Sequence, residues 1–121
     1  GVAYIRAMSA LDGLALPEKE VVGRTILSKA LETPIRIIAS NSGNEAAVVL
    51  DQVRSNSDAN YGFDAKGNAY GDMVAKGIID STKVSRAALE NAASVGSMIL
   101  TSQALISEQD HEEEADHGHV H

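Results

Sequence analysis

Apolar residues recur at helical spacing through the first half of the chain. Residues 2–14 carry a large apolar side chain at every third position, which predicts a helix with one inward face. A second helix is predicted from Pro17, because proline suits a first turn and glutamates follow it. Pro34 is expected to break or kink this helix, since proline lacks an N–H. The helix is expected to end at Ser42-Gly43, with glycine at its exit.

Two further helices are predicted later in the chain. Asn44 is expected to cap a helix that continues to about Val53. Asp80 or Ser81 is expected to cap the longest helix, which runs to about residue 102. Polar residues occupy only one narrow stripe of that helix. We therefore expect it to be buried on more than one side.

A single region carries a strand pattern. Tyr61 and Phe63 alternate with glycine, and an alanine–tyrosine pair follows after a short polar stretch. Gly67 suits the left-handed position of a tight turn, so a β-hairpin is predicted here. Residues 73–76 are expected to form one helical turn closed by Gly77. The predicted fold class is therefore mainly α, a helical bundle with one short β-hairpin.

Composition narrows the function. The 121 residues fit one small domain or a fragment of a larger one. A formal net charge of -7 argues against a nucleic-acid partner and against anionic membrane surfaces. No apolar run reaches the roughly 18 to 20 residues that a membrane span requires. Cysteine is absent, which excludes disulfides and thiolate metal sites and fits a reducing compartment.

Composition also divides the chain. We expect residues 1–107 to form one domain and residues 108–121 to form a disordered acidic and histidine-rich tail. The tail has almost no apolar side chains to offset the entropy of ordering it. The first residues do not resemble a signal peptide, and no initiator methionine precedes them. We therefore expect the chain to begin inside a longer protein.

Candidate chemistry is sparse. The chain has no phosphate-loop pattern, and all four histidines lie in the tail, so no ordered Ser-His pair is expected. His117, His119 and His121 alternate beside carboxylates and could bind zinc, nickel or copper. The competing interpretation is a solvated tail without a biological metal. Asp80 also has two interpretations, a helix cap or a carboxylate that accepts hydrogen bonds from a ribose.

Several blocks of sequence resemble one known family. Their order and spacing are similar to the C-terminal part of the equatorial, nucleotide-binding domain of GroEL-type (group I) chaperonins, and the likeness spans about residues 1–107. The blocks are GVAYIR at 1–6, ALETPIRII at 30–38, NYGFDA at 60–65, YGDM at 70–73, GIID at 77–80 and TKVSRAALENAASV at 82–95.

The resemblance implies an ATP-dependent chaperone of the cytoplasm. Its subunits would form a double heptameric ring that works with a co-chaperonin lid and refolds unfolded client proteins. Asp64, Ala65 and Lys66 would contact the adenine base. Asp80 would hold the ribose, with Ile78 packing nearby, so that the turn and Asp80 form one wall of a nucleoside pocket.

Three positions depart from the family pattern. The family usually has asparagine where Asp64 stands, a small residue where Lys66 stands and proline where Ser81 stands. A carboxylate accepts but does not donate hydrogen bonds, which puts a side-chain contact between Asp64 and the base in doubt. Contacts through the main chain of Ala65 are compatible with either residue.

The resemblance also bears on catalysis. It places the phosphate-binding loops, the Mg²⁺ ligand and the water-activating aspartate before Gly1. No catalytic and no metal-binding residue is therefore predicted in this chain, and ATP hydrolysis by this segment alone is not expected.

Assembly is a second implication. Arg36 and Glu45 match a charged pair that bridges the two rings, and the alternative is two ordinary exposed charges. The segment Ala104 to Ile106, which could extend the last helix or form an edge strand, resembles a segment that pairs with a neighbouring subunit. Two other functions remain open, a free-standing helical interaction module and a metal-handling protein acting through its tail.

Overall fold

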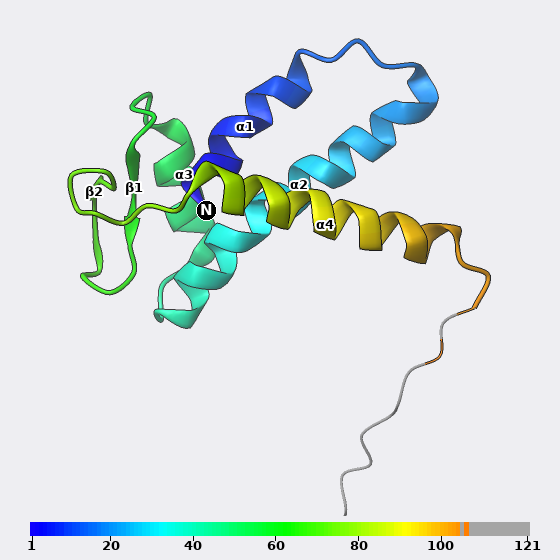
Figure 1. Cartoon of the computed structure of the whole chain (residues 1–121). Helices are drawn as coiled ribbons and strands as arrows, with labels where there is room; N and C mark the ends of the chain where they lie inside the picture. Colours follow the sequence, from blue (N-terminus) through cyan, green and yellow to red (C-terminus); the bar gives the residue numbers. More distant parts are fainter. Residues whose placement is uncertain (105, 107–121) are drawn as a thin grey trace, which may run out of the picture. The chain divides into compact units, whose positions relative to one another are not determined.

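The computed structural model describes residues 1–104 and 106, and the chain divides into two compact units. The first unit, residues 1–79, carries three helices and one hairpin, which Figure 1 draws from blue to green. The second unit begins at Asp80, and its described residues carry one helix. This content confirms the predicted mainly α fold with one short β-hairpin. The elements are α1 (Val2–Asp12), α2 (Glu18–Asn41), α3 (Ala46–Ser55), β1 (Tyr61–Asp64), β2 (Ala69–Asp72) and α4 (Thr82–Thr101).

The three helices of the first unit pack around one apolar core. Helix α2 contacts both α1 and α3, and β1 contacts α3. Apolar positions three and four residues apart give each helix one inward face, as predicted for α1. The buried apolar side chains are Ile5, Met8, Leu31, Ile35, Ala39, Val49, Leu50, Val53, Phe63 and Met73.

Helix α2 has nearly the bounds that the sequence predicts. Pro17 is its N-cap, and the helix continues through Pro34 to Asn41, so of the two outcomes predicted at Pro34 the break is excluded. Leu31 and Ile35 are both buried on either side of the proline. Their packing stabilises the helix against the loss of one main-chain hydrogen bond. Gly43 follows with a left-handed φ of 79°, which confirms a glycine at the exit.

The N-terminus of α3 differs from the prediction by one residue. Glu45 is the N-cap, in extended conformation, and Asn44 precedes it. The Asn44 amide instead donates hydrogen bonds to the carbonyl oxygen and to Oγ of Ser42, at 3.3 and 3.0 Å. Asn44 therefore stabilises the connection between α2 and α3 without capping α3.

The hairpin has a defined register and an aromatic face. Phe63 pairs with Tyr70, and Gly62 pairs with Gly71. The Tyr70 ring lies 5.2 Å from the Phe63 ring and 5.9 Å from the Tyr61 ring, centroid to centroid. The opposite face carries Gly62 and Gly71, because side chains alternate along a strand.

The second unit contains only α4 as regular structure in its described residues. Ser81 is the N-cap, which was one of the two predicted positions, but no side-chain hydrogen bond caps the helix. No residue of α4 is buried, so the predicted burial on several sides is wrong here. Among the described residues of this unit, α4 has no second element to pack against. Large apolar side chains are therefore exposed along it, among them Val84, Val95, Met98, Ile99 and Leu100.

The end of the chain is described only in part. Ala104 and Ile106 have no regular secondary structure, whereas Leu105 and residues 107–121 lie outside the described residues. The prediction of a disordered tail from residue 108 falls there too. Among the residues that the structure describes, none of the helices combines the length and the hydropathy of a transmembrane segment.

Candidate functional site

Three of the predicted contact residues lie in the hairpin turn. Asp64 ends β1, and Ala65 and Lys66 follow it in the turn. Asp64 Oδ1 accepts a hydrogen bond from the Gly67 N–H at 2.9 Å, and Asp64 Oδ2 lies 3.6 Å from Lys76 Nζ. Each carboxylate oxygen of Asp64 is therefore engaged in shaping the turn. Ala65 has no polar side chain, so main-chain groups are the means by which it can recognise a ligand.

Glycine at position 67 leaves room for the Asp64 carboxylate. A Cβ on Gly67 would lie 2.5 Å from Asp64 Oδ2, which is closer than any real contact allows. The left-handed residue of the turn is Asn68, with a φ of 49°, and the prediction that Gly67 takes this conformation is wrong. Asparagine tolerates the left-handed region, so Asn68 can take this conformation in the turn. Gly67 can then lie close to the Asp64 carboxylate.

The Gly67 N–H holds the pKa of Asp64 below its ordinary value. Partial desolvation opposes this effect, and the Lys76 ammonium adds to it. Because the folded-state pKa is lowered, Asp64 stabilises the fold above its unfolded pKa of about 3.9. That contribution is lost as the pH falls through the lower folded-state pKa.

We expect a carboxyl carbon NMR titration of the folded chain to show this shift. The midpoint for Asp64 should lie below that of an aspartate in an unfolded peptide. The Gly67 amide shift should titrate with the same midpoint, since its N–H reports the charge on Oδ1. A midpoint at or above the peptide value would contradict the engaged carboxylate.

A second turn follows β2 and leads to Ile78. Asp72 Oδ1 accepts the Ala75 N–H at 3.0 Å, and the Asp72 carbonyl accepts the Lys76 N–H at 3.1 Å. Gly77 closes the turn with a φ of 70°, which confirms the predicted turn and its closing glycine. The Ile78 N–H then donates to the Met73 carbonyl at 2.9 Å. Ile78 is thereby fixed at the end of the turn, with its side chain 46% exposed.

Asp80 is the first residue of the second unit. It is exposed and precedes Ser81, the N-cap of α4, so Asp80 itself is not the cap. The structure brings Asp64, Ala65 and Lys66 together in one turn. The predicted nucleoside pocket between Ala65 and Asp80 spans the two units and stays a prediction.

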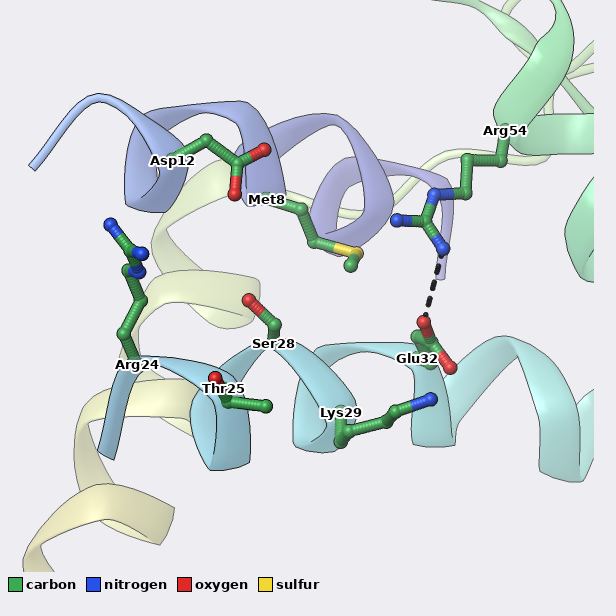
Figure 2. A pocket seen from close by; sticks show the side chains of 8 residues that line it. All are labelled: Met8, Asp12, Arg24, Thr25, Ser28, Lys29, Glu32 and Arg54. Atoms are coloured by element: carbon green, nitrogen blue, oxygen red, sulfur yellow. Dashed lines mark hydrogen bonds and ion pairs between the residues drawn. The ribbon is translucent and has the colours of Figure 1, made fainter. Parts of the chain in front are cut away.

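A polar cleft of about 270 Å³ lies in the first unit, between α1, α2 and the end of α3 (Figure 2). Sequence reasoning did not predict it. Arg24 on its rim donates a hydrogen bond to the Leu14 carbonyl at 3.3 Å. The lining residues are Met8, Asp12, Arg24, Thr25, Ser28, Lys29, Glu32 and Arg54.

One end of this cleft holds a buried carboxylate. Glu32 is only 4% exposed, and its Oε2 accepts hydrogen bonds from Nε and Nη2 of Arg36 at 3.2 and 3.1 Å. Its Oε1 accepts one from Arg54 Nη1 at 3.2 Å, drawn as a dashed line in Figure 2. Glu32 therefore joins α2 to α3. The i,i+4 spacing of Glu32 and Arg36 is a sequence signal for half of this network, whereas nothing local pointed to Arg54.

The predicted ring-interface residues lie on α2 and at the start of α3. The Arg36 side chain is 40% exposed, although it contacts Glu32. Glu45 is exposed at the N-cap of α3. Within the described part of the chain, the ion pairs include one from Arg36 to Glu32 and none from Arg36 to Glu45.

Arg6 is a second residue that sequence reasoning missed. Its Nη1 donates to the Asn56 carbonyl at 2.8 Å, and its Nη2 donates to the carbonyls of Asp58 and Tyr61 at 2.7 and 3.4 Å. Arg6 therefore ties α1 to the loop that leads into β1. No sequence pattern reveals this contact, because the acceptors are main-chain groups about fifty residues away.

The possible metal ligands predicted from the sequence are histidines near the end of the chain. In residues 1–104 and 106, no group of three or more histidine, aspartate and glutamate side chains is placed to hold a metal ion. The alternative of a metal-handling protein depends on His117, His119 and His121, which fall outside those residues.

Comparison with protein-family models gives one match. Residues 1–110 match the model of the TCP-1/cpn60 chaperonin family, and the chain therefore belongs to this family. Its role is a chaperonin-type role in protein folding. Chaperonins of this family are in general ATP-dependent and form oligomeric rings that act on client proteins. The match favours the chaperonin interpretation over a free-standing interaction module.

Proposed function

We propose that this chain supplies the base and ribose contacts of the ATP pocket in a group I, GroEL-type chaperonin. In this proposal the turn at Asp64, Ala65 and Lys66 contacts the adenine, and Asp80 holds the ribose hydroxyls beside Ile78. The proposal assigns no phosphate, Mg²⁺ or catalytic group to these residues. ATP is the cofactor, and hydrolysis requires groups other than these.

The observation that carries the proposal is the construction of the turn. Asp64 contacts the Gly67 N–H and Lys76 Nζ, so its carboxylate fixes the main-chain path past Ala65 and Lys66. A main-chain edge held in one conformation can bind a planar base at a small entropy cost. The family match over the same residues supports adenine as that base.

The ribose contact rests on the chemistry of Asp80. An exposed carboxylate can accept hydrogen bonds from vicinal hydroxyls, and such charge-assisted bonds are stronger than neutral ones. Ile78 offers an exposed apolar side chain two residues earlier, suited to packing against the sugar or the base.

The same proposal includes ring assembly. Arg36 and Glu45 would form the charged contact between the two heptameric rings. Helix α2 also exposes large apolar side chains, with Val22 65% and Ile26 64% exposed, which is typical of a surface that other protein covers. Subunits of the same chain, a co-chaperonin lid and unfolded client proteins are the proposed partners, in the cytoplasm.

Titration of the ¹⁵N-labelled chain with adenosine tests the pocket. We expect amide shift changes confined to Ala65, Lys66, Ile78 and Asp80 and their neighbours. The dissociation constant should be about millimolar, which corresponds to about −4 kcal/mol, because phosphate contacts make no contribution. The proposal would be contradicted if adenosine changed no amide shift of these residues, or changed amide shifts equally throughout the chain.

Asp80→Ala provides the matched test of the ribose contact. We expect it to weaken adenosine binding about tenfold, the effect of losing hydrogen bonds to a charged group. 2′,3′-Dideoxyadenosine lacks the vicinal 2′- and 3′-hydroxyls, so it should bind the Asp80→Ala variant and the unmodified chain equally. Asp51→Ala removes an exposed acid from α3 and serves as the control.

A further inference from the structure

One face of the β-hairpin leaves room for a long side chain to cross it. Gly62 and Asp64 of β1 and Ala69 and Gly71 of β2 share this face, because side chains alternate along each strand. A Cβ on Gly71 would lie 3.2 Å from Cε and 3.8 Å from Nζ of Lys76. The Lys76 side chain therefore passes over the Cα of Gly71, in space that a larger residue would occupy.

Lys76 joins two turns that are separate in the sequence. Its main chain belongs to the turn after β2, where its N–H donates to the Asp72 carbonyl. Its ammonium lies 3.6 Å from Asp64 Oδ2, in the turn between the strands. The Lys76 and Asp64 side chains are 34% and 19% exposed, so solvent screens the pair only in part.

We propose that Lys76 is a positioning residue for the nucleoside. Its ion pair with Asp64 holds Ala65 and Lys66 in a fixed position relative to Ile78, the other predicted contact of the first unit. This inference rests on the proposed function, since it concerns the same ligand. Gly71 contributes because it has no side chain in the space that the Lys76 side chain occupies.

The expected effect follows from the population of the competent turn. If a ligand binds only one orientation of the turn, its apparent affinity is proportional to the fraction of molecules in that orientation. Partly exposed ion pairs of this kind shift such an equilibrium by up to about fivefold. Lys76 is therefore expected to change affinity for the nucleoside moderately, without being in contact with it.

Lys76→Met keeps most of the side-chain length and removes the charge. We expect adenosine to bind this variant about three- to fivefold more weakly than the unmodified chain, by the NMR titration described above. Lys76→Arg keeps the cation and should restore binding to within about twofold. Lys19→Met, which removes an exposed lysine at the start of α2, should leave binding unchanged. Gly71→Ala keeps the lysine and requires its Cε to shift only slightly, so it should weaken binding less than Lys76→Met.

A ligand-free measurement separates the two proposals. In Lys76→Met the pKa of Asp64 should rise, because a favourable charge is gone, while the Gly67 N–H still holds it below its ordinary value. If the pKa rises but adenosine binds as before, the positioning role is overturned and the proposed function stands. If the unmodified chain shows no adenosine-dependent shifts, the proposed function fails, and the nucleoside role of Lys76 fails with it. An unchanged pKa would show that the Lys76–Asp64 pair does not form.

Discussion

Replacing Arg36 and Arg54 together by methionine is expected to lower the free energy of unfolding by about 3–5 kcal/mol. The change leaves the Glu32 carboxylate, which is 4% exposed, without its hydrogen-bond donors. A buried charge that loses its partners keeps its desolvation cost and loses the attraction that offset it. Urea denaturation followed by far-UV circular dichroism measures the effect.

A variant that also lacks the Glu32 carboxylate is the matched control. Adding Glu32→Met to the double variant should recover most of the lost stability, because a fully apolar replacement of a buried ion network is often nearly neutral. Each single variant keeps one arginine bonded to Glu32 and should lose only about 1–2 kcal/mol. A triple variant no more stable than the double variant would show that the arginines act through packing and not through the carboxylate.

The helices of this chain were predictable because their signals are local. Spacing of apolar residues located α1 and α4 to within about two residues, and Pro17 and Gly43 marked the two ends of α2. Of the two outcomes predicted at Pro34, a break does not occur, because the packing of the helix outweighs the low helix propensity of proline. The buried neighbours Leu31 and Ile35 keep the helix continuous, and their burial depends on helices that lie elsewhere in the sequence.

The candidate site shows the same division between local and distant causes. The resemblance placed Asp64, Ala65 and Ile78 in one region, and the turns that carry them follow from glycine positions. The use of the Asp64 carboxylate could not be predicted, because it depends on Lys76 reaching across the hairpin. Gly67 was predicted to be left-handed, whereas it leaves space for that carboxylate and donates its N–H to it.

Arg6→Met is expected to lower the free energy of unfolding by about 2–3 kcal/mol. It removes two short, charge-assisted hydrogen bonds to main-chain carbonyls of Asn56 and Asp58 and a longer one to Tyr61. The loss is smaller than three full bonds because Arg6 Nε is buried without a partner, and methionine eliminates that cost. Urea denaturation of the variant beside the unmodified chain measures the difference.

Loss of the Arg6 contacts should increase hydrogen exchange in the hairpin more than in the helical core. Arg6 connects α1 to the loop before β1, so its loss should speed hydrogen exchange at the β1 and β2 amides more than at those of α2. Lys76→Met, in contrast, should affect the turn amides alone, since it joins two parts of the same hairpin region. Arg6→Lys keeps the charge, but one ammonium cannot match the planar arrangement of donors, and its effect should be intermediate. Equal acceleration over α2 and the hairpin would contradict a local role for Arg6 and indicate that it stabilises the unit as a whole.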